Sequence, residues 1–237
     1  MAGSRVPRIL FLIADTGGGH RSAANAIRAA MDLIAPEIDI PNAPAPHVGI
    51  DAQELPFSPS VYLPAAWSQV PRPWHADIHD IFQECGRSPI RRTMKMYGPA
   101  VTNTPTLYAG FYYATNTLPI FTALSALNKS LIRRGLIEAL PRWRPDLIVS
   151  VHPLLTQPTL EIVRRVFHAK IPAITVVTDL VRFHRAWAMP DVDFCIVPTA
   201  AARDLMVQIG MPPNKIRLVG MPIHPKFCLP PAERSTT

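Results

Sequence analysis

Five consecutive residues near the start of the chain combine glycines with a histidine. Residues 16–20 read Thr-Gly-Gly-Gly-His and lie between an apolar run, residues 9–13, and the expected opening of a helix, residues 21–27. The first amides of a helix lack partners within it and carry partial positive charge, so they favour an anion such as a phosphate. The same charge disfavours protonation of His20, whose neutral imidazole can take a proton from a hydroxyl. The stretch predicts either an anion site with a general base or a merely structural turn.

The spacing of these glycines does not match the known nucleotide-binding loops. A dinucleotide fold needs Gly-x-Gly-x-x-Gly and a P-loop needs Gly-Lys-Ser/Thr. His20 occupies the position where the first motif has its last glycine and the second has its lysine. A nucleotide-dependent oxidoreductase is therefore a weak hypothesis, kept open only by Asp51 as the acidic residue of a second strand.

Alternating apolar runs and amphipathic stretches predict the elements that must position this turn. We expect strands at residues 8–14, 47–51, 146–151, 173–177, 193–197 and 216–219, and helices at 21–34, 111–113, 118–140, 156–167 and 200–209. Residues 55–89 are rich in proline and are expected to form an irregular insertion. Strands buried on both faces, with helices between them, predict an α/β fold with a doubly wound parallel sheet.

Polar residues follow four of the expected strands, where ligand sites of such sheets lie. The candidates are Thr16 to His20 (with Gly17, Gly18 and Gly19), His152, Thr178 and Asp179 with His184 and Trp187 downstream, and Gly220 with Pro222. Each has a structural alternative: His152 bonds a backbone carbonyl, Asp179 caps a turn, or Trp187 belongs to the core. Their spacing is not that of a metal site.

Composition limits the class of protein. The chain has 237 residues, 27 prolines, only 11 glycines and a formal charge of +7, so acidic membranes, nucleic acids and phosphate ligands are all conceivable partners. No nucleic-acid-binding module is recognisable, and we expect no nucleic-acid partner. The three cysteines show no paired spacing, which predicts neither disulfides nor zinc.

One segment, residues 96–128, holds no charged residue and many aromatic ones. Prolines and polar residues interrupt it, so it lacks the continuous apolar length of a membrane span. Basic residues flank it on both sides, among them Arg91, Arg92, Lys129 and Arg133. It therefore forms either buried helices or a surface that dips into an anionic membrane interface.

Four blocks of the sequence carry a resemblance to a known family. They are Ile-Ala-Asp-Thr-Gly-Gly-Gly-His-Arg-Ser-Ala-Ala-Asn-Ala-Ile, Pro-Asp-Leu-Ile-Val-Ser-Val-His-Pro, Thr-Asp-Leu with His184 and Trp187, and Val-Gly-Met-Pro-Ile. In order and spacing the chain resembles the N-terminal domain of monogalactosyldiacylglycerol synthases and the related processive diacylglycerol glucosyltransferases. These enzymes are similar to two-domain GT-B glycosyltransferases with Rossmann-like halves, the N-terminal half binding the lipid acceptor and the C-terminal half the UDP-sugar.

The resemblance implies roles for the candidate residues. His20 is implied to be the base that deprotonates the sn-3 hydroxyl of diacylglycerol, for direct attack on the anomeric carbon with inversion. Gly17, Gly18 and Gly19 are implied to line the cleft near the diphosphate of UDP-glucose or UDP-galactose, with no tightly bound cofactor and no metal. The resemblance also implies which residues shape the acceptor side of the site: His152, Thr178, Asp179, His184 and Trp187. It implies that the interdomain region includes Gly220 and Pro222.

The resemblance also sets the expected organisation. Residues 1–227 are expected to be the acceptor domain and residues 228–237 the start of an interdomain linker, with the donor domain absent or separately encoded and the chain alone inactive. The implied partners are diacylglycerol and an anionic membrane surface, at a cytoplasmic, peripheral location on the inner face of the plasma membrane. The alternative is a lipid-binding remnant without catalysis.

Overall fold

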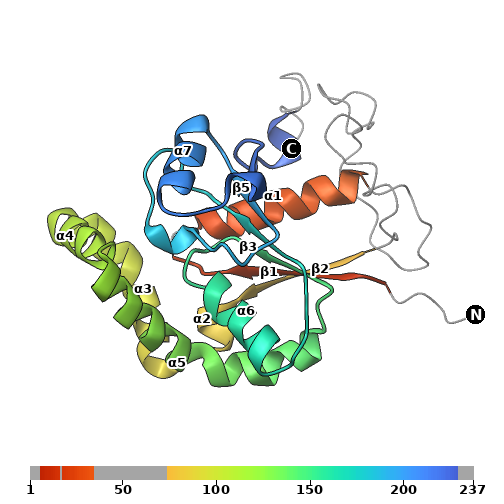
Figure 1. Cartoon of the computed structure of the whole chain (residues 1–237), viewed down its shortest axis with the longest axis horizontal. Coiled ribbons are helices and arrows are strands. Elements are labelled where there is room, and N and C mark those ends of the chain that lie inside the picture. The colour runs from red at the N-terminus through yellow and green to blue at the C-terminus, as the bar shows by residue number, and fades with distance from the viewer. Residues whose placement is uncertain (1–5, 17, 35–73, 229–237) are drawn as a thin grey trace, which may run out of the picture.

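The structure, a computed structural model, describes residues 6–16, 18–34 and 74–228, and its centre is a parallel sheet (Figure 1). The strands of the described part are β1 (Arg8–Ile13), β2 (His75–Asp80), β3 (Leu147–Ser150), β4 (Ala173–Val176), β5 (Phe194–Val197) and β6 (Ile216–Leu218). They lie in the order β2-β1-β3-β4-β5-β6, and every neighbouring pair is parallel. The α/β class and the Rossmann-like parallel sheet are confirmed.

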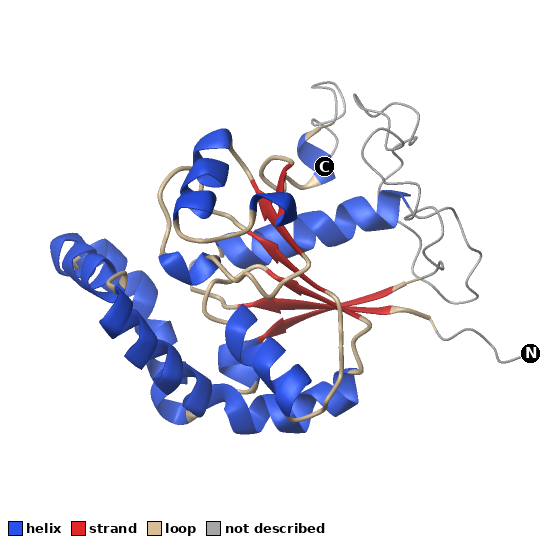
Figure 2. Ribbon diagram, in the orientation of Figure 1, coloured by secondary structure: helices blue, strands red, loops and turns tan. Residues whose placement is uncertain are grey.

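Helices cover both faces of this sheet (Figure 2). They are α1 (Gly19–Ile34), α2 (Ile81–Glu84), α3 (Ser88–Asn103), α4 (Pro105–Thr115), α5 (Leu118–Trp143), α6 (Thr156–Arg165) and α7 (Ala200–Gln208), with 3-10 turns η4 (Arg185–Trp187), η5 (Pro213–Lys215) and η6 (Pro225–Phe227). Alternate residues of β1 point to opposite faces, as in any strand. Phe11 packs against α1, whereas Leu10 and Leu12 belong to the larger core with α2, α5, α6 and α7.

The strand order places a topological switch point between β1 and β3. The chain leaves β1 to form β2 on one side and returns to form β3 on the other. In open parallel sheets the carboxyl ends of two such strands diverge into a crevice that binds ligands. The loops after β1 and β3, which carry His20 and His152, therefore flank that crevice.

The prediction of an irregular segment at residues 55–89 is wrong in its described part, residues 74–89. That part contains β2, α2 and the start of α3. The strand reads His-Ala-Asp-Ile-His-Asp and is mostly only half-buried at the edge of the sheet, so it lacks the apolar run by which the other strands are recognised. The strand expected at residues 47–51, residues 55–73 and nearly all of the expected linker, residues 229–237, lie outside the described residues.

A group of helices extends beyond the carboxyl ends of the strands (Figure 1). This helical layer, as we call it, consists of α3, α4 and residues 118–128 of α5. None of the residues of α3 is buried. Large apolar side chains are open to solvent, among them Met96 (62% exposed), Leu107 (73%) and Phe111 (59%). The alternative that residues 96–128 pack as buried helices is therefore wrong for most of the segment. Within the described residues, no helix has the length and apolar character needed to cross a membrane.

The three cysteines are all unpaired, as expected. Cys85 and Cys195 are buried, and burial raises the pKa of each thiol to about 12. At neutral pH both are therefore neutral thiols that fill the core rather than nucleophiles.

Candidate functional site

The glycine turn forms the start of α1 in the way that an anion site requires. Gly18 has a φ of +80°, a conformation that residues with a side chain rarely adopt. Its carbonyl accepts the first helical hydrogen bond, from the Ser22 N–H at 2.9 Å. The next residue, Gly19, begins the helix, and His20 follows it. The amides of the first turn, which have no partners within the helix, and the imidazole therefore lie together at the positive end of a helix of 16 residues.

Carboxylates hold the turn in place from two sides. The Asp15 N–H donates to the buried carboxylate of Asp80, at the end of β2, over 3.1 Å. The Asp15 carboxylate in turn accepts from Arg21 Nε at 2.7 Å. The neighbouring strand and the first helical turn thus fix the backbone immediately before the glycines.

His20 is surrounded by residues that follow β3 and β4. Its ring lies edge-on to the ring of His152, with centroids 4.7 Å apart, and its Nδ1 lies 3.4 Å from Thr178 Oγ1. His152 is only 5% exposed and its Nδ1 accepts the Leu154 N–H at 3.3 Å, so its other ring nitrogen carries the proton in the neutral form. These three side chains converge because each follows the carboxyl end of a strand in the same parallel sheet.

Trp187 connects the remaining candidate carboxylate to this group. The indole N–H donates to Asp179 Oδ2 at 2.6 Å, and the indole lies 6.3 Å from the His20 ring. Trp187 is almost completely buried. The contact orients Asp179 at the exposed edge of the site, where its charge acts on His20.

The protonation states of the two histidines follow from their surroundings. Burial lowers the pKa of His20 below its ordinary value, while Asp179, a hydrogen bond to the Val151 backbone and Asp15 oppose the shift. Burial, and then the nearby His20, lower the pKa of His152 well below the ordinary range. Both imidazoles are neutral at pH 7. Of the two, only His20 has a carboxylate that favours its charged form, which suits a base that must accept a proton.

A cavity of about 390 Å³ opens over His20. Its lining residues are Thr16, Gly19, His20, Ser22, Ala23, Tyr97, Thr178, Asp179, Met221 and Pro222. The structure thus gathers His20, Thr178, Asp179 and Pro222 around one space, with His152 and Trp187 directly behind. Gly17 lies outside the described residues. Gly18 and Gly220 shape the backbone at φ +80° and +118° and are not among the lining residues.

His184 lies between aromatic side chains of the helical layer. Its ring lies between those of Tyr112 and Phe121, at 5.6 Å from each, and its Nδ1 accepts the Ala186 N–H to cap η4. It is absent from the cavity lining. The histidine therefore joins the helical layer to the turn that carries Trp187.

Tyr97 lines the cavity although it does not follow any of the strands at whose ends the candidate residues were sought. It comes from α3, a helix that was not expected as such, and lies 77 positions from His20 along the chain. Nothing in the local pattern marks it, because its position follows from how the helical layer packs at the carboxyl end of the sheet.

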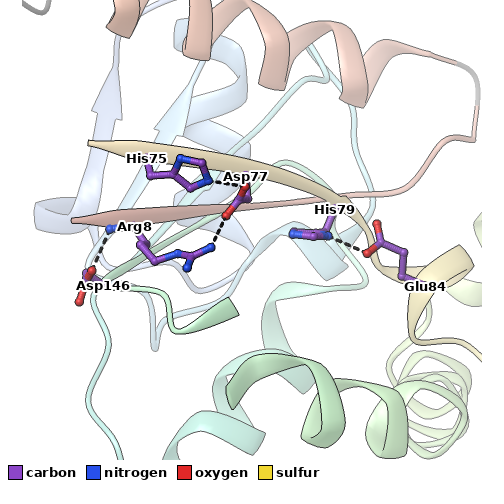
Figure 3. Close-up of polar contacts among 6 residues, drawn as sticks. All are labelled: Arg8, His75, Asp77, His79, Glu84 and Asp146. Atoms are coloured by element: carbon purple, nitrogen blue, oxygen red, sulfur yellow. Dashed lines mark hydrogen bonds and ion pairs between the residues drawn. The ribbon is translucent and has the colours of Figure 1, made fainter. Parts of the chain in front are cut away.

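The opposite end of the sheet carries polar contacts of its own (Figure 3). Arg8, the first residue of β1, pairs with Asp77 at 2.9 Å, and its backbone N–H donates to Asp146 at 2.8 Å. His75 Nε2 lies 2.9 Å from Asp77 Oδ1. These contacts fasten the amino ends of the strands and lie away from the crevice. No group of His, Cys, Asp or Glu within the described ranges is placed to hold a metal ion.

We expect Asp179→Asn to lower the pKa of His20 further. Burial lowers the wild-type pKa below its ordinary value and the Asp179 charge raises it, so removing that charge makes protonation of the imidazole harder. Nuclear magnetic resonance titration of the ring resonances measures the change. Asp204→Asn, which removes an exposed carboxylate on α7, serves as the control. An unchanged or raised His20 pKa in Asp179→Asn would contradict the assigned electrostatic contact.

Comparison with known proteins identifies the family of the chain. The family model described as monogalactosyldiacylglycerol (MGDG) synthase matches residues 72–223, more than half of the chain. The chain is 31% identical over 221 residues to monogalactosyldiacylglycerol synthase, chloroplastic, of Spinacia oleracea, covering 93% of the chain and 35% of that protein. It is 28% identical over 227 residues to monogalactosyldiacylglycerol synthase 1, chloroplastic, of Arabidopsis thaliana, covering 95% and 36%. The chain spans about a third of the length of these relatives, and it belongs to the monogalactosyldiacylglycerol synthase family.

Proposed function

We propose that the chain is the acceptor-binding part of a hexosyltransferase that moves a sugar from a UDP-sugar to the sn-3 hydroxyl of diacylglycerol, with inversion. One observation carries the proposal. His20 stands as a neutral imidazole at the switch point of the sheet, on a cavity and within the field of a carboxylate. Membership of the family supplies the substrate class, because the names of the relatives describe galactosyl transfer to diacylglycerol.

In this proposal His20 takes the proton of the sn-3 hydroxyl while that oxygen attacks the anomeric carbon. The bond from the anomeric carbon to the UDP oxygen breaks on the opposite side, and UDP leaves with the electron pair. The imidazole becomes an imidazolium, and Asp179 stabilises the new charge. No covalent intermediate forms, so a single in-line displacement inverts the anomeric centre.

The start of α1 is the proposed position of the donor diphosphate. Gly19 lines the cavity, and the amides of the first helical turn, which have no partners within the helix, favour negative charge. We assign Gly17, Gly18 and Gly19 to this cleft, and Gly220 with Pro222 to the region facing a donor domain that binds most of the nucleotide. The names of the relatives favour galactose over glucose, and hence UDP-galactose.

We assign the acceptor side of the cavity to Thr178, Asp179 and the pair behind them, His152 and Trp187. Thr178 and Asp179 line the cavity on the side of β4, next to His20. His184 supports this side indirectly, through the turn that carries Trp187.

We further propose that the helical layer docks on an anionic membrane. Basic residues flank its apolar part: Arg91, Arg92 and Lys95 lie in the first half of α3, and Arg133 follows the apolar first part of α5. Lys129, which also follows that part, pairs with Glu161 of α6. The apolar side chains between these basic residues are exposed. Such a surface inserts apolar groups at the interface while its basic residues meet anionic headgroups. The inner face of the plasma membrane stays a prediction, since the relatives carry the word chloroplastic in their names.

Vesicle binding checks this docking. We expect the chain to co-sediment with vesicles containing phosphatidylglycerol, and Phe111→Asp to weaken that binding about tenfold, because a charge at an inserted position is costly. Added salt should weaken binding by the wild-type chain, since exposed charges are screened. Val207→Asp, at an exposed apolar position of α7, is the control. Equal loss in both variants, or binding to neutral vesicles alone, would contradict docking by the helical layer.

Transfer itself tests the proposed function. The chain is joined to the part of the spinach synthase that lies beyond the matched region, and galactose transfer from UDP-galactose to diacylglycerol is measured. Vesicle binding without any transfer by this fusion would favour the alternative, a lipid-binding protein without catalysis.

A further inference from the structure

The cavity over His20 has walls from four parts of the chain. The glycine turn with α1, the segment after β4 and the segment after β6 supply three of them. The fourth is Tyr97, from the helical layer. The exposed apolar layer and the histidine site thus share a wall, although neither the sequence nor the family assignment connects them.

The size of the cavity limits what it can enclose. Pockets of 300–1,000 Å³ bury ligands of drug size, and this one, at about 390 Å³, lies near the lower limit. A glycerol group with the first carbons of its chains fits that space, whereas two long acyl chains must continue outside it. Those chains need an apolar surface that begins at the rim of the cavity.

The surroundings of the rim differ in polarity. On the side of the glycine turn lies the exposed pair of Asp15 and Arg21. On the side of Tyr97 lies the second half of α3, where Met96 is exposed and no charged residue occurs until Lys129.

Apolar residues also lie at two other walls, with Met221 after β6 and the exposed Leu180 and Val181 after β4. The Tyr97 side differs because it continues into the helical layer, which holds no charged residue over residues 96–128. The segment after β6 is the side that we assign to the donor domain, and the helical layer gives acyl chains a long apolar surface that begins at the rim.

We propose that Tyr97 is an acceptor-binding residue, and that the acyl chains of diacylglycerol leave the cavity past its ring and over the helical layer. The proposal rests on the proposed function, since it takes diacylglycerol as the acceptor. A tyrosine suits the position because its ring contacts apolar chains while its hydroxyl tolerates the polar ester region. The ring thereby places the sn-3 hydroxyl at the inner end of the cavity, towards His20.

Binding of a soluble diacylglycerol to the chain tests the proposal without any need for catalysis. Dioctanoylglycerol is added to chain labelled at histidine, and the His20 ring resonances, assigned with His20→Gln, report occupation of the cavity. We expect Tyr97→Ala to raise the dissociation constant about tenfold, the factor that corresponds to about 1.4 kcal/mol. Tyr97→Phe should bind nearly as the wild type does, because the ring is retained.

Phe167→Ala is the matched control. Phe167 and Tyr97 have the same exposed fraction, 36%, but Phe167 follows α6 and is not among the cavity lining. If wild-type chain shows no His20 response to dioctanoylglycerol, the proposed acceptor site itself is wrong. If the wild type responds and Tyr97→Ala binds equally well, the proposed function stands and the assignment of Tyr97 is wrong.

A photoreactive lipid provides a test that needs no variant. A diacylglycerol with a diazirine midway along one acyl chain is irradiated with the wild-type chain, and labelled peptides are identified by mass spectrometry. Labelling of the peptide from residues 96–104 supports the proposed path. Labelling confined to residues 213–228 places the acyl chains on the other side of the cavity and overturns it.

Discussion

Replacement of His20 by alanine is expected to lower the rate of galactosyl transfer by the fusion protein about 100- to 10,000-fold, the range that a positioned general base contributes. The neutral imidazole is the group that faces both the cavity and the carboxylate of Asp179. Without it, the hydroxyl must attack while still protonated. The measurement is the initial rate of galactosyldiacylglycerol formation at saturating UDP-galactose.

His75→Ala is the matched control for this loss. It removes a histidine at the amino end of β2, at the end of the sheet remote from the crevice (Figure 3). We expect its transfer rate to stay within a factor of about three of the parent, because a surface substitution at the other end of the sheet touches neither the cavity nor His20. Binding of dioctanoylglycerol by His20→Ala, followed through His152, separates lost chemistry from a lost site. Transfer by His20→Ala within tenfold of the parent would mean that another group takes the proton.

The second large effect concerns stability and lies at Gly135, in the interior of α5. A Cβ at this position would lie 2.2 Å from the Cys85 carbonyl oxygen and 2.5 Å from its Cα, far inside van der Waals contact. Both are backbone atoms, so no side chain can turn aside. We expect Gly135→Ala to lower the free energy of unfolding by about 3 kcal/mol, the upper part of the usual range for overpacking. Urea denaturation followed by circular dichroism measures it.

Gly110→Ala makes the same substitution in another helix and should have the opposite sign. A Cβ at Gly110, in α4, meets nothing within 4 Å. Alanine favours helix over glycine by about 0.8–1.0 kcal/mol, so the unfolding free energy should rise by up to that amount. A similar effect of both substitutions would show that helix propensity, rather than the approach of α5 to Cys85, decides the result at Gly135.

The sequence predicted the strands best where apolar and β-branched residues predominate. The runs at residues 8–14, 146–151, 173–177, 193–197 and 216–219 all became strands within one or two residues of the expected bounds. The edge strand β2 was not predicted, because its half-buried positions hold His and Asp instead of an apolar run. The long α3 was not predicted either. None of its residues is buried, and its sequence contains glycine and proline, so no apolar face marks it as a helix.

The site was predictable to the extent that the topology determines it. Residues at the carboxyl ends of β1, β3 and β4 had to converge, and His20, His152 and Thr178 did so. The hydrogen bond from Trp187 to Asp179 depends on the shape of the loop between them, which no periodic pattern encodes. Tyr97 and the true neighbours of His184 depend on how helices distant in sequence pack, and such contacts leave no local signal.

The exposed helical layer has a consequence for how concentration acts on this protein. With its apolar side chains gathered at one end of the molecule, and with Tyr97 leading from that end into the cavity, a docked chain meets lipid only within the plane of the bilayer. Under the proposed function, the quantity that governs occupancy of the cavity is the mole fraction of diacylglycerol in the membrane. Diluting the surface with inert lipid should then lower occupancy at constant bulk concentration.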